Sequence, residues 1–395
     1  MIVKRMQALG EKRSVIREIF EYGKIRKSEI GAENVFDFSL GNPSVPAPAC
    51  VTEALKELLC ERDAVSLHGY TSAQGDADVR GAIAKYLNES YGVGCSANDL
   101  YMTVGAAASL SACLSAVAGA GEEVVAFAPF FPEYRVFTEQ TGARLAVVPL
   151  DEESFQISFD EFLSVINEKT AAVIINSPSN PSGVILSAET LARLGEILTK
   201  KSKEYGHTIY LIADEPYREL AYDGVVVPYP TLFYPDTLVC YSFSKSISLP
   251  GERIGYILVS PAAKEKSALY AAICGAGRSL GYVCAPSLFQ HLIPKVLGKT
   301  ADVSIYKHNR DLLYESLTAY GFTAVKPEGA FYLFLKSPES DANAFCERAK
   351  KYELLLVPGD DFAAPGYVRI SYCVQSEQIE RALPAFQKLA EEYNL

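Results

Sequence analysis

TLVCYSFSKSISLPGERIGYILVS, residues 237–260, holds two runs of strand-forming residues, 237–243 and 255–260, around a stretch that carries Lys245. Both runs lack charged residues and are rich in β-branched, aliphatic and aromatic side chains, which favours strands. Apolar residues at successive positions indicate strands that are buried on both faces, as in a sheet covered by helices on each side. The stretch therefore predicts two sheet strands, with a lysine where the first one ends.

Five similar runs precede these two, and helical stretches separate them. They are LYMTV (100–104), EVVAFA (123–128), ARLAVVPL (143–150), TAAVIIN (170–176) and TIYLIAD (208–214). Strands that alternate with helices are the pattern of an α/β fold. We therefore expect a mostly parallel, seven-stranded sheet sandwiched by helices.

After residue 290 the pattern changes to helices mixed with shorter runs, which indicates a smaller α+β domain. The runs are FTAVKP (322–327), AFYLFLK (330–336), LLLVPGD (354–360) and YVRISYC (367–373). A chain of 395 residues has room for two domains. We predict a large domain at 49–290 and a small domain formed by 1–48 together with 291–395.

Composition and charge narrow the classes of partner. The net charge of −11 argues against nucleic acid, because proteins that bind it normally carry a basic face. The most apolar segment, 105–121, is too short and too rich in small and hydroxyl residues to span a bilayer, so it predicts a buried helix and no membrane partner. The first 31 residues mix basic and acidic side chains without the apolar region of a secretory signal, and predict an amphipathic helical arm.

The nine cysteines are scattered, contain no C-x-x-C pair and cannot all pair within one chain because their number is odd. Reduced thiols in a cytoplasmic protein fit this pattern best. The four histidines show no metal-ligand spacing, so we expect no metal site.

Reactive side chains follow the predicted strands. Gly105-Ala106-Ala107 opens a helix whose free N–H groups suit a phosphate. Asn180 lies in NSPSNPSG (176–183), Asp214 and Tyr217 lie in DEPY (214–217), and Lys245 follows 237–243. Ligands of open α/β sheets bind outside the carboxyl ends of the strands, so we expect these residues to converge on one edge.

A lysine for a Schiff base, an acid for a pyridinium nitrogen, and amide and phenol donors for a phenolate oxygen together indicate a pyridoxal 5′-phosphate pocket. NSPSNPSG, DEPY and SFSKSISLPGERIGY, in this order, closely resemble the class I/II aminotransferases of fold type I, a family that includes the aspartate aminotransferases. The resemblance runs from FSLGNPSVPAP (38–48) to YVRISYC (367–373).

The resemblance implies a role for each matching position around the cofactor. Lys245 would bind the cofactor covalently and later move the substrate's α-proton, which requires an amine that loses its charge near neutrality. Asp214 would keep the ring nitrogen protonated, and Asn180 and Tyr217 would hydrogen-bond the ring oxygen. The phosphate would meet Gly105, Ala106, Ala107, Ser242, Ser244 and the guanidinium of Arg253.

The resemblance also implies how the substrate and a second subunit meet this pocket. Phe131, in APFFPEY (128–134), would stack on the cofactor ring. Arg369 would bind the substrate α-carboxylate, with help from Gly41 and Asn180. Tyr70, in HGYTSAQG (68–75), would reach the phosphate of another subunit, which implies a homodimer with shared sites.

Each of these positions also has an ordinary structural interpretation. Lys245 could be a solvated lysine in a turn, and Asp214 could be a helix N-cap. Arg369 could form a surface ion pair of little worth. Phe131 could belong to the core, and Asn180 could merely form a turn before proline.

Three functions are compatible with the pocket. The first is an aminotransferase that moves the amino group of an α-amino acid to a 2-oxo acid in a ping-pong mechanism. The second is a pyridoxal-phosphate-dependent β-lyase, since lyases of this fold keep nearly the same residues. The third is a ligand-sensing regulator, but such regulators carry a DNA-binding module ahead of this domain, and only about 35 residues precede FDFSL (36–40).

The motifs indicate the side chain of the substrate less clearly than they indicate the cofactor. Aspartate and glutamate are the candidates. Some relatives that use aspartate have a lysine where this chain has Ala107. A carboxylate next to the cofactor needs a cation. Arg278, in CGAGRSLGYVCAP (274–286), is the candidate, because this region often approaches the neighbouring subunit's site in relatives of this fold.

Overall fold

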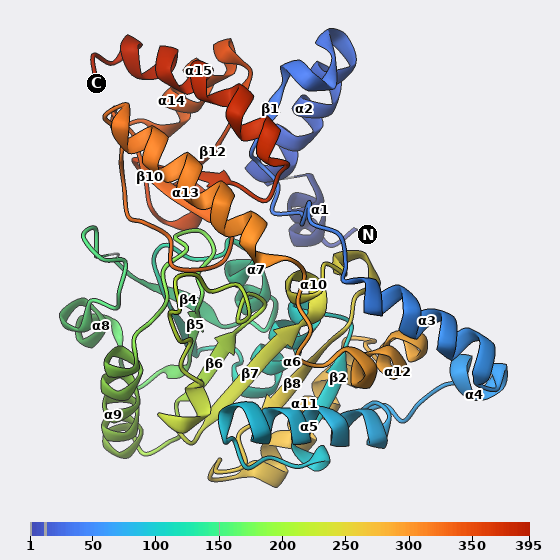
Figure 1. Cartoon of the computed structure of the whole chain (residues 1–395). Coiled ribbons are helices and arrows are strands. Elements are labelled where there is room, and N and C mark those ends of the chain that lie inside the picture. Colours follow the sequence, from blue (N-terminus) through green and yellow to red (C-terminus); the bar gives the residue numbers. More distant parts are fainter. Residues whose placement is uncertain (1, 12–13, 150) are drawn as a thin grey trace.

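The computed structural model describes residues 2–11, 14–149 and 151–395, and its centre is a seven-stranded sheet (Figure 1). The order across the sheet is β2-β8-β7-β6-β5-β3-β4. The strands are β2 (Leu100–Thr103), β3 (Glu123–Phe127), β4 (Arg144–Val148), β5 (Thr170–Asn176), β6 (Tyr210–Asp214), β7 (Thr237–Ser242) and β8 (Gly255–Val259). Each strand lies within one of the seven runs expected from the sequence.

The sheet is parallel except at β8, which pairs antiparallel with both β7 and β2. The prediction of a mostly parallel α/β sheet is confirmed. The parallel strands β5, β6 and β7 therefore end at the same edge, next to the start of helix α6.

Helices cover both faces of this sheet (Figure 1). Successive residues of β3 point to opposite faces of the sheet. Val124 packs in a core with α6 and α11, and Val125 packs in a different core with α5, α9 and α12. The helices of this part are α3 (Ala49–Glu61), α4 (Ala64–His68), α5 (Ala77–Tyr91), α6 (Ala106–Val117), α7 (Glu133–Gln140), α8 (Phe159–Val165), α9 (Ala188–Tyr205), α10 (Phe243–Ser246), α11 (Lys266–Ser279) and α12 (Ser287–Val296).

The C-terminal part lies above the large sheet in Figure 1 and is built on a four-stranded antiparallel sheet of order β12-β13-β10-β9. A second, two-stranded sheet pairs β1 with β11 in parallel. The elements are β1 (Phe36–Asp37), α13 (Val303–Ala319), β9 (Thr323–Ala324), β10 (Tyr332–Lys336), α14 (Ala342–Ala349), β11 (Leu354–Leu355), β12 (Val357–Pro358), β13 (Tyr367–Ser371) and α15 (Ser376–Glu392). Because β1 pairs with β11, the chain starts in the C-terminal part, then forms the large sheet, and finally returns to the C-terminal part.

The predicted division at residues 48 and 290 stays a prediction. Its second boundary falls inside α12, and Leu292, Ile293 and Val296 of that helix pack in the same core as the large sheet. This helix therefore belongs by its packing to the larger part of the molecule.

The N-terminal segment forms two helices, α1 (Lys4–Glu11) and α2 (Val15–Ile30), and α1 buries none of its side chains. The predicted buried helix at 105–121 is confirmed as α6, where Ala108 to Leu114 are all buried. Over the described residues, the helices are each too short or too polar to cross a membrane.

Candidate active site

A cavity of about 290 Å³ lies at the carboxyl ends of β5, β6 and β7, where the C-terminal part meets the large sheet. Its walls come from both parts of the chain. The lining residues are Ile16, Leu40, Gly41, Ala106, Ala107, Leu110, Phe131, Asn176, Asn180, Asp214, Pro216, Tyr217, Ser242, Ser244, Lys245, Pro250, Arg253, Tyr332 and Arg369.

Lys245 lies on α10, the single turn that directly follows β7. Its Nζ donates a hydrogen bond to the carbonyl oxygen of Gly41 at 2.6 Å and lies 5.4 Å from the ring centre of Phe331. Burial lowers the pKa of Lys245 to about 8, and the positive charges of Arg253 and Arg369 act in the same direction. At pH 7 the ammonium form still predominates, but the uncharged amine, which is the nucleophile, is far more populated than in an ordinary lysine.

Asp214 is the last residue of β6 and is buried. Its Oδ2 accepts a hydrogen bond from the hydroxyl of Tyr134 at 2.6 Å, whereas its Oδ1 has no partner among the residues that the structure describes. Burial raises the pKa of Asp214 to about 7, although the Tyr134 hydrogen bond opposes the rise. A buried carboxylate with one unpartnered oxygen is suited to bind a cationic N–H group.

Arg369 on β13 is buried and reaches across to the large sheet. Its Nη1 donates to Oδ1 of Asn180 at 3.0 Å and its Nη2 donates to the carbonyl oxygen of Ser39 at 2.6 Å, while Nε has no partner in the described part of the chain. The guanidinium carbon lies 4.8 Å from the ring centre of Tyr332. These partners are all neutral, so the charge of Arg369 is available for an anionic ligand in the cavity.

The phenol of Tyr217 faces the cavity and shares a hydrogen bond of 2.9 Å with the hydroxyl of Tyr332. Both side chains are buried, and burial raises the pKa of Tyr217 well above its ordinary value. Tyr217 is therefore a neutral hydroxyl group that can donate one hydrogen bond and accept another.

The opposite end of the cavity is suited to a phosphate. α6 begins at Gly105, which has φ of 92°, and this helix start has neither a side-chain cap nor an acidic residue in its first turn. A Cβ on Gly105 would lie 2.6 Å from Nη2 of Arg253, so only glycine lets the guanidinium approach the helix start this closely. Ser242 and Ser244 line the same cavity.

Two further predicted residues line the cavity. Phe131 forms part of its wall and packs edge-on against Tyr134, with ring centres 5.8 Å apart. Gly41 accepts the Lys245 hydrogen bond, and a Cβ at this position would collide with the hydroxyl of Tyr332.

Tyr70 and Arg278 lie away from this chain's own cavity. Tyr70 follows α4 and is 99% exposed, and Arg278 is exposed in the last turn of α11. The loop after α11 contacts the segment after Tyr70, since Cys284 Sγ lies 3.4 Å from the carbonyl oxygen of Thr71. The segments that follow the two residues are therefore in contact, and both side chains are exposed.

Sequence analysis missed several residues of the site. Asn176 donates from Nδ2 to the carbonyl oxygen of Asp214 at 2.7 Å and accepts from the backbone N–H of Asn180 at 2.6 Å. Asn176 ends a predicted strand, so the rule that identified Asp214 applies to it equally. Tyr134 and Tyr332 become part of the site only through contacts across 80 and 115 residues, for which the sequence gives no local signal.

Comparison with known proteins identifies the same family that the sequence motifs resemble. The model of the family "Aminotransferase class I and II" matches residues 33–386. The chain belongs to this family. This aminotransferase is 31% identical to an aspartate aminotransferase of Thermotoga maritima, over 89% of this chain and 90% of the relative. It is 28% identical to aromatic-amino-acid aminotransferase 2 of Thermococcus litoralis, over 97% of each chain.

Two solved structures place the fold in the same family. A crystal structure of an amino transferase from Eubacterium rectale has a TM-score of 0.98 and 56% identity over the whole of both chains. Aspartate aminotransferase from Thermus thermophilus, solved with maleate, has a TM-score of 0.86 and 26% identity over 98% of this chain and 99% of that one.

Members of this family depend on pyridoxal 5′-phosphate, and the side chains of the cavity fit this cofactor. Asp214 Oδ1 and Arg369 Nε are buried without partners, and the glycine cradle at Gly105 leaves room for an anion beside Arg253. When bound, the cofactor provides the electron sink that stabilises negative charge on the substrate's α-carbon.

Proposed function

We propose that this aminotransferase moves the amino group of an α-amino acid to a 2-oxo acid through a site that two subunits share. The arrangement of cations in the cavity carries the proposal. Arg253 lies at the phosphate end, Lys245 lies at the centre, and Arg369 lies on the side of the C-terminal sheet. The guanidinium groups of Arg253 and Arg369 would bind the phosphate and the substrate α-carboxylate, and the uncharged amine of Lys245 would attack the aldehyde carbon.

In this proposal the chain's own residues bind, orient and transfer protons. Arg369 binds the α-carboxylate, and its hydrogen bonds to Asn180 and Ser39 fix the plane of the guanidinium. The uncharged form of Lys245 Nζ, which the lowered pKa makes accessible, takes the α-proton and delivers it to the carbon of the cofactor aldehyde. Asp214 holds the ring nitrogen in its protonated state, and Asn180 and Tyr217 donate to the ring oxygen.

A homodimer accounts for the exposed region around Tyr70. An aromatic side chain that is 99% exposed buries nothing within its own chain. The apolar side chains of Val65, on α4, and Val283, next to Cys284, are 80% and 49% exposed. Exposed apolar patches of this kind mark interaction surfaces. In the dimer, Tyr70 of one subunit reaches the phosphate bound by the other.

Mixed dimers test the shared site. Lys245→Ala protein and Tyr70→Ala protein are each purified, mixed and allowed to exchange subunits. If Tyr70 acts across the interface, the mixed dimer contains one site with neither lesion, and activity rises above the sum of the parents. No gain after verified exchange, or a fully active monomer by sedimentation, would contradict the shared site.

We propose aspartate or glutamate as the amino donor. The relatives include aspartate aminotransferases, and Arg278 is an exposed cation on α11, whose following loop contacts the segment after Tyr70. The planar guanidinium suits a side-chain carboxylate.

A second candidate is an amino acid with an aromatic or other apolar side chain. Within the described residues that line the cavity, the cations are Lys245, Arg253 and Arg369, and all three have other roles. The side chains of Ile16 and Leu40 add apolar wall. One relative in this family is named for aromatic amino acids.

A single experiment separates these candidates and also separates transfer from β-elimination. Holoenzyme is mixed with one amino acid at a time, without a 2-oxo acid, and the absorbance of the bound cofactor is followed. Transfer gives one equivalent of 2-oxo acid per site and then stops until an acceptor is added. Continuous release of ammonia and pyruvate from β-substituted amino acids would instead identify a β-lyase.

The free state of all nine cysteines supports a reducing compartment, and we infer that the enzyme is cytoplasmic. Fractionation of cells that express the tagged protein from its own promoter tests this inference.

A further inference from the structure

The hydroxyl of Tyr134 is a buried donor that touches the acid of the cofactor site. Tyr134 is 1% exposed, on the first turn of α7, and its hydroxyl donates to Asp214 Oδ2 at 2.6 Å. Among the described residues, this is the only side-chain hydrogen bond that the Asp214 carboxylate accepts. The other oxygen, Oδ1, has no partner and belongs to a residue that lines the cavity.

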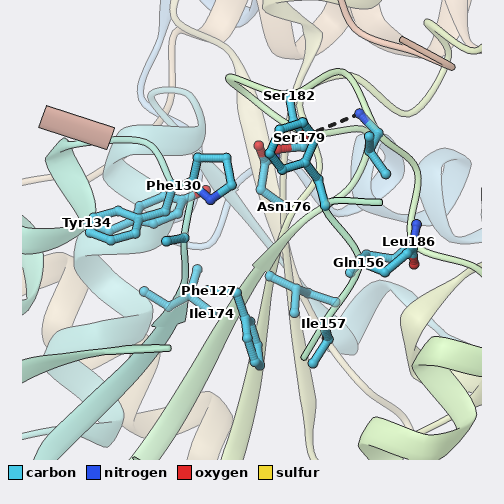
Figure 2. A pocket seen from close by; sticks show the side chains of 15 residues that line it. Phe127, Phe130, Tyr134, Gln156, Ile157, Ile174, Asn176, Ser179, Ser182 and Leu186 are labelled. Carbon is cyan, nitrogen blue, oxygen red and sulfur yellow. Dashed lines mark hydrogen bonds between the residues drawn. The ribbon is translucent and has the colours of Figure 1, made fainter. Parts of the chain in front are cut away.

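The ring of Tyr134 is held in one orientation by its neighbours. It stacks on Phe130 with ring centres 6.3 Å apart and planes 13° apart, and Phe131 packs edge-on against it at 5.8 Å. Figure 2 shows Phe130 and Tyr134 side by side at the edge of a small cavity that Asn176 also lines. A tyrosine fixed in this way presents its hydroxyl at a constant position without losing rotamer entropy when the cofactor binds.

The polar groups next to Asp214 do not provide a second hydrogen bond to its carboxylate in place of the one from Tyr134. Glu215, the next residue, is paired with Arg218, whose Nε donates to Oε2 at 2.7 Å. Asn176 donates to the backbone carbonyl of Asp214 and not to its carboxylate. The phenol of Tyr134 is thus the group that offsets the desolvation of the buried carboxylate.

We propose that Tyr134 is a positioning residue that keeps Asp214 ionised and turns its free oxygen toward the cofactor ring nitrogen. A hydrogen bond to the charged form favours that form over the neutral acid. With the hydrogen bond in place, a proton shared between Asp214 and the ring nitrogen resides on the nitrogen. Without it, desolvation is opposed only by the cofactor itself, and the proton moves toward the carboxylate. Burial raises the pKa of Asp214, and the Tyr134 hydrogen bond acts against this rise.

The inference rests on the proposed role of Asp214, which is to bind the ring nitrogen of the cofactor. The experiment therefore measures cofactor binding as well as turnover. Cofactor-free protein is prepared from wild type and Tyr134→Phe, and pyridoxal phosphate affinity is measured by equilibrium titration. Loss of one hydrogen bond to a charged group predicts affinity lower by about 10- to 100-fold. The absorbance of the bound cofactor should also titrate at a different pH, and kcat should fall more than KM changes.

Tyr234→Phe is the matched control. The Tyr234 hydroxyl is equally buried and donates to the carbonyl oxygen of Ile209 at 2.7 Å, away from the cavity. This variant should bind the cofactor as wild type does and show the same pH titration. An equal loss in both variants would mean that buried hydroxyl groups matter only for folding, and would overturn the proposal.

A double-mutant cycle with Asp214→Asn separates positioning from general stability. Once the carboxylate is an amide, Tyr134→Phe should change cofactor affinity little, whereas a purely structural tyrosine would cost the same in both backgrounds. If Tyr134→Phe does not fold, Tyr134→His, which keeps a ring N–H donor, is the second variant. A folded Tyr134→His protein that binds the cofactor no better than Asp214→Asn would contradict the donor role. Failure of wild type itself to bind pyridoxal phosphate would refute the cofactor site and not Tyr134 alone.

Discussion

Arg369 donates a hydrogen bond from Nη1 to Oδ1 of Asn180 at 3.0 Å, and this contact joins strand β13 to the loop after β5. The pair connects residues 189 positions apart and closes one side of the cavity. The acceptor is a neutral amide. Because a buried arginine without a carboxylate is costly, the pair indicates that an anionic ligand completes the charge balance.

Replacement of Arg369 by lysine should therefore lower kcat/KM sharply. Arg369→Lys keeps the charge and loses the planar fork that binds a carboxylate through two hydrogen bonds. We expect kcat/KM for every amino-acid substrate to fall by an amount equivalent to about 1.5–3 kcal/mol, mostly through KM. Steady-state kinetics with two unrelated amino acids measures this, and the bound cofactor's absorbance should not change. An unaltered KM would assign the α-carboxylate to another group.

Lys245→Ala should abolish both turnover and the covalent attachment of the cofactor. Borohydride reduction followed by mass spectrometry detects the attachment in wild type, and an undiminished adduct in the variant would rule out Lys245. In wild type, the pKa of about 8 predicts that the rate of attachment rises with pH and levels off above about pH 8, because only the uncharged amine attacks the aldehyde. Stopped-flow absorbance after mixing cofactor-free protein with pyridoxal phosphate measures this profile.

The large sheet could be predicted from the sequence because its strands are buried on both faces. TAAVIIN coincides with β5 over all seven residues, and each of its first six residues is fully or nearly fully buried. Short strands of the C-terminal part carry no such pattern. The strand β1, of two residues, forms only because Phe36 and Asp37 pair with Leu354 and Leu355 more than 300 positions later.

The residues of the site also fall into those that the sequence could predict and those that it could not. Lys245, Asp214 and Asn180 follow buried strands, and the topology of a parallel sheet brings strand ends together. Tyr134 does not directly follow a buried strand, and its contact with Asp214 depends on how α7 packs against β4 and α6. Tyr70 and Arg278 could be named from the resemblance but not located in a site, because the group each would bind belongs to another subunit.

Asp214 should make the stability of the cofactor-free protein depend on pH. Burial raises its folded pKa to about 7, above the ordinary value of about 3.9 for the unfolded chain. Between these values the folded state binds a proton that the unfolded state lacks. The stabilisation by this residue is therefore complete below about pH 4 and is lost as the pH rises through about 7.

Asp214→Asn removes this dependence. The free energy of unfolding of wild type relative to the variant should fall by at most about 4 kcal/mol from pH 4 to pH 7. Urea unfolding of both cofactor-free proteins over this range measures the difference. Parallel stability curves would show that Asp214 is ionised in the empty cavity as it is in the unfolded chain.

Arg278 supplies the sharpest test of the substrate. It is exposed at the end of α11, and Ala107 occupies the position where some aspartate-using relatives carry a lysine, so a side-chain carboxylate in the cavity would need a cation from a second subunit. Arg278→Ala should lower kcat/KM for aspartate and glutamate by about 1.5–3 kcal/mol and leave alanine and phenylalanine almost unchanged. Arg193→Ala, which removes an exposed arginine on α9, is the control for the change in net charge. Equal losses on acidic and neutral substrates would indicate an effect on folding or cofactor binding, and no loss on either would favour the aromatic or apolar amino donor.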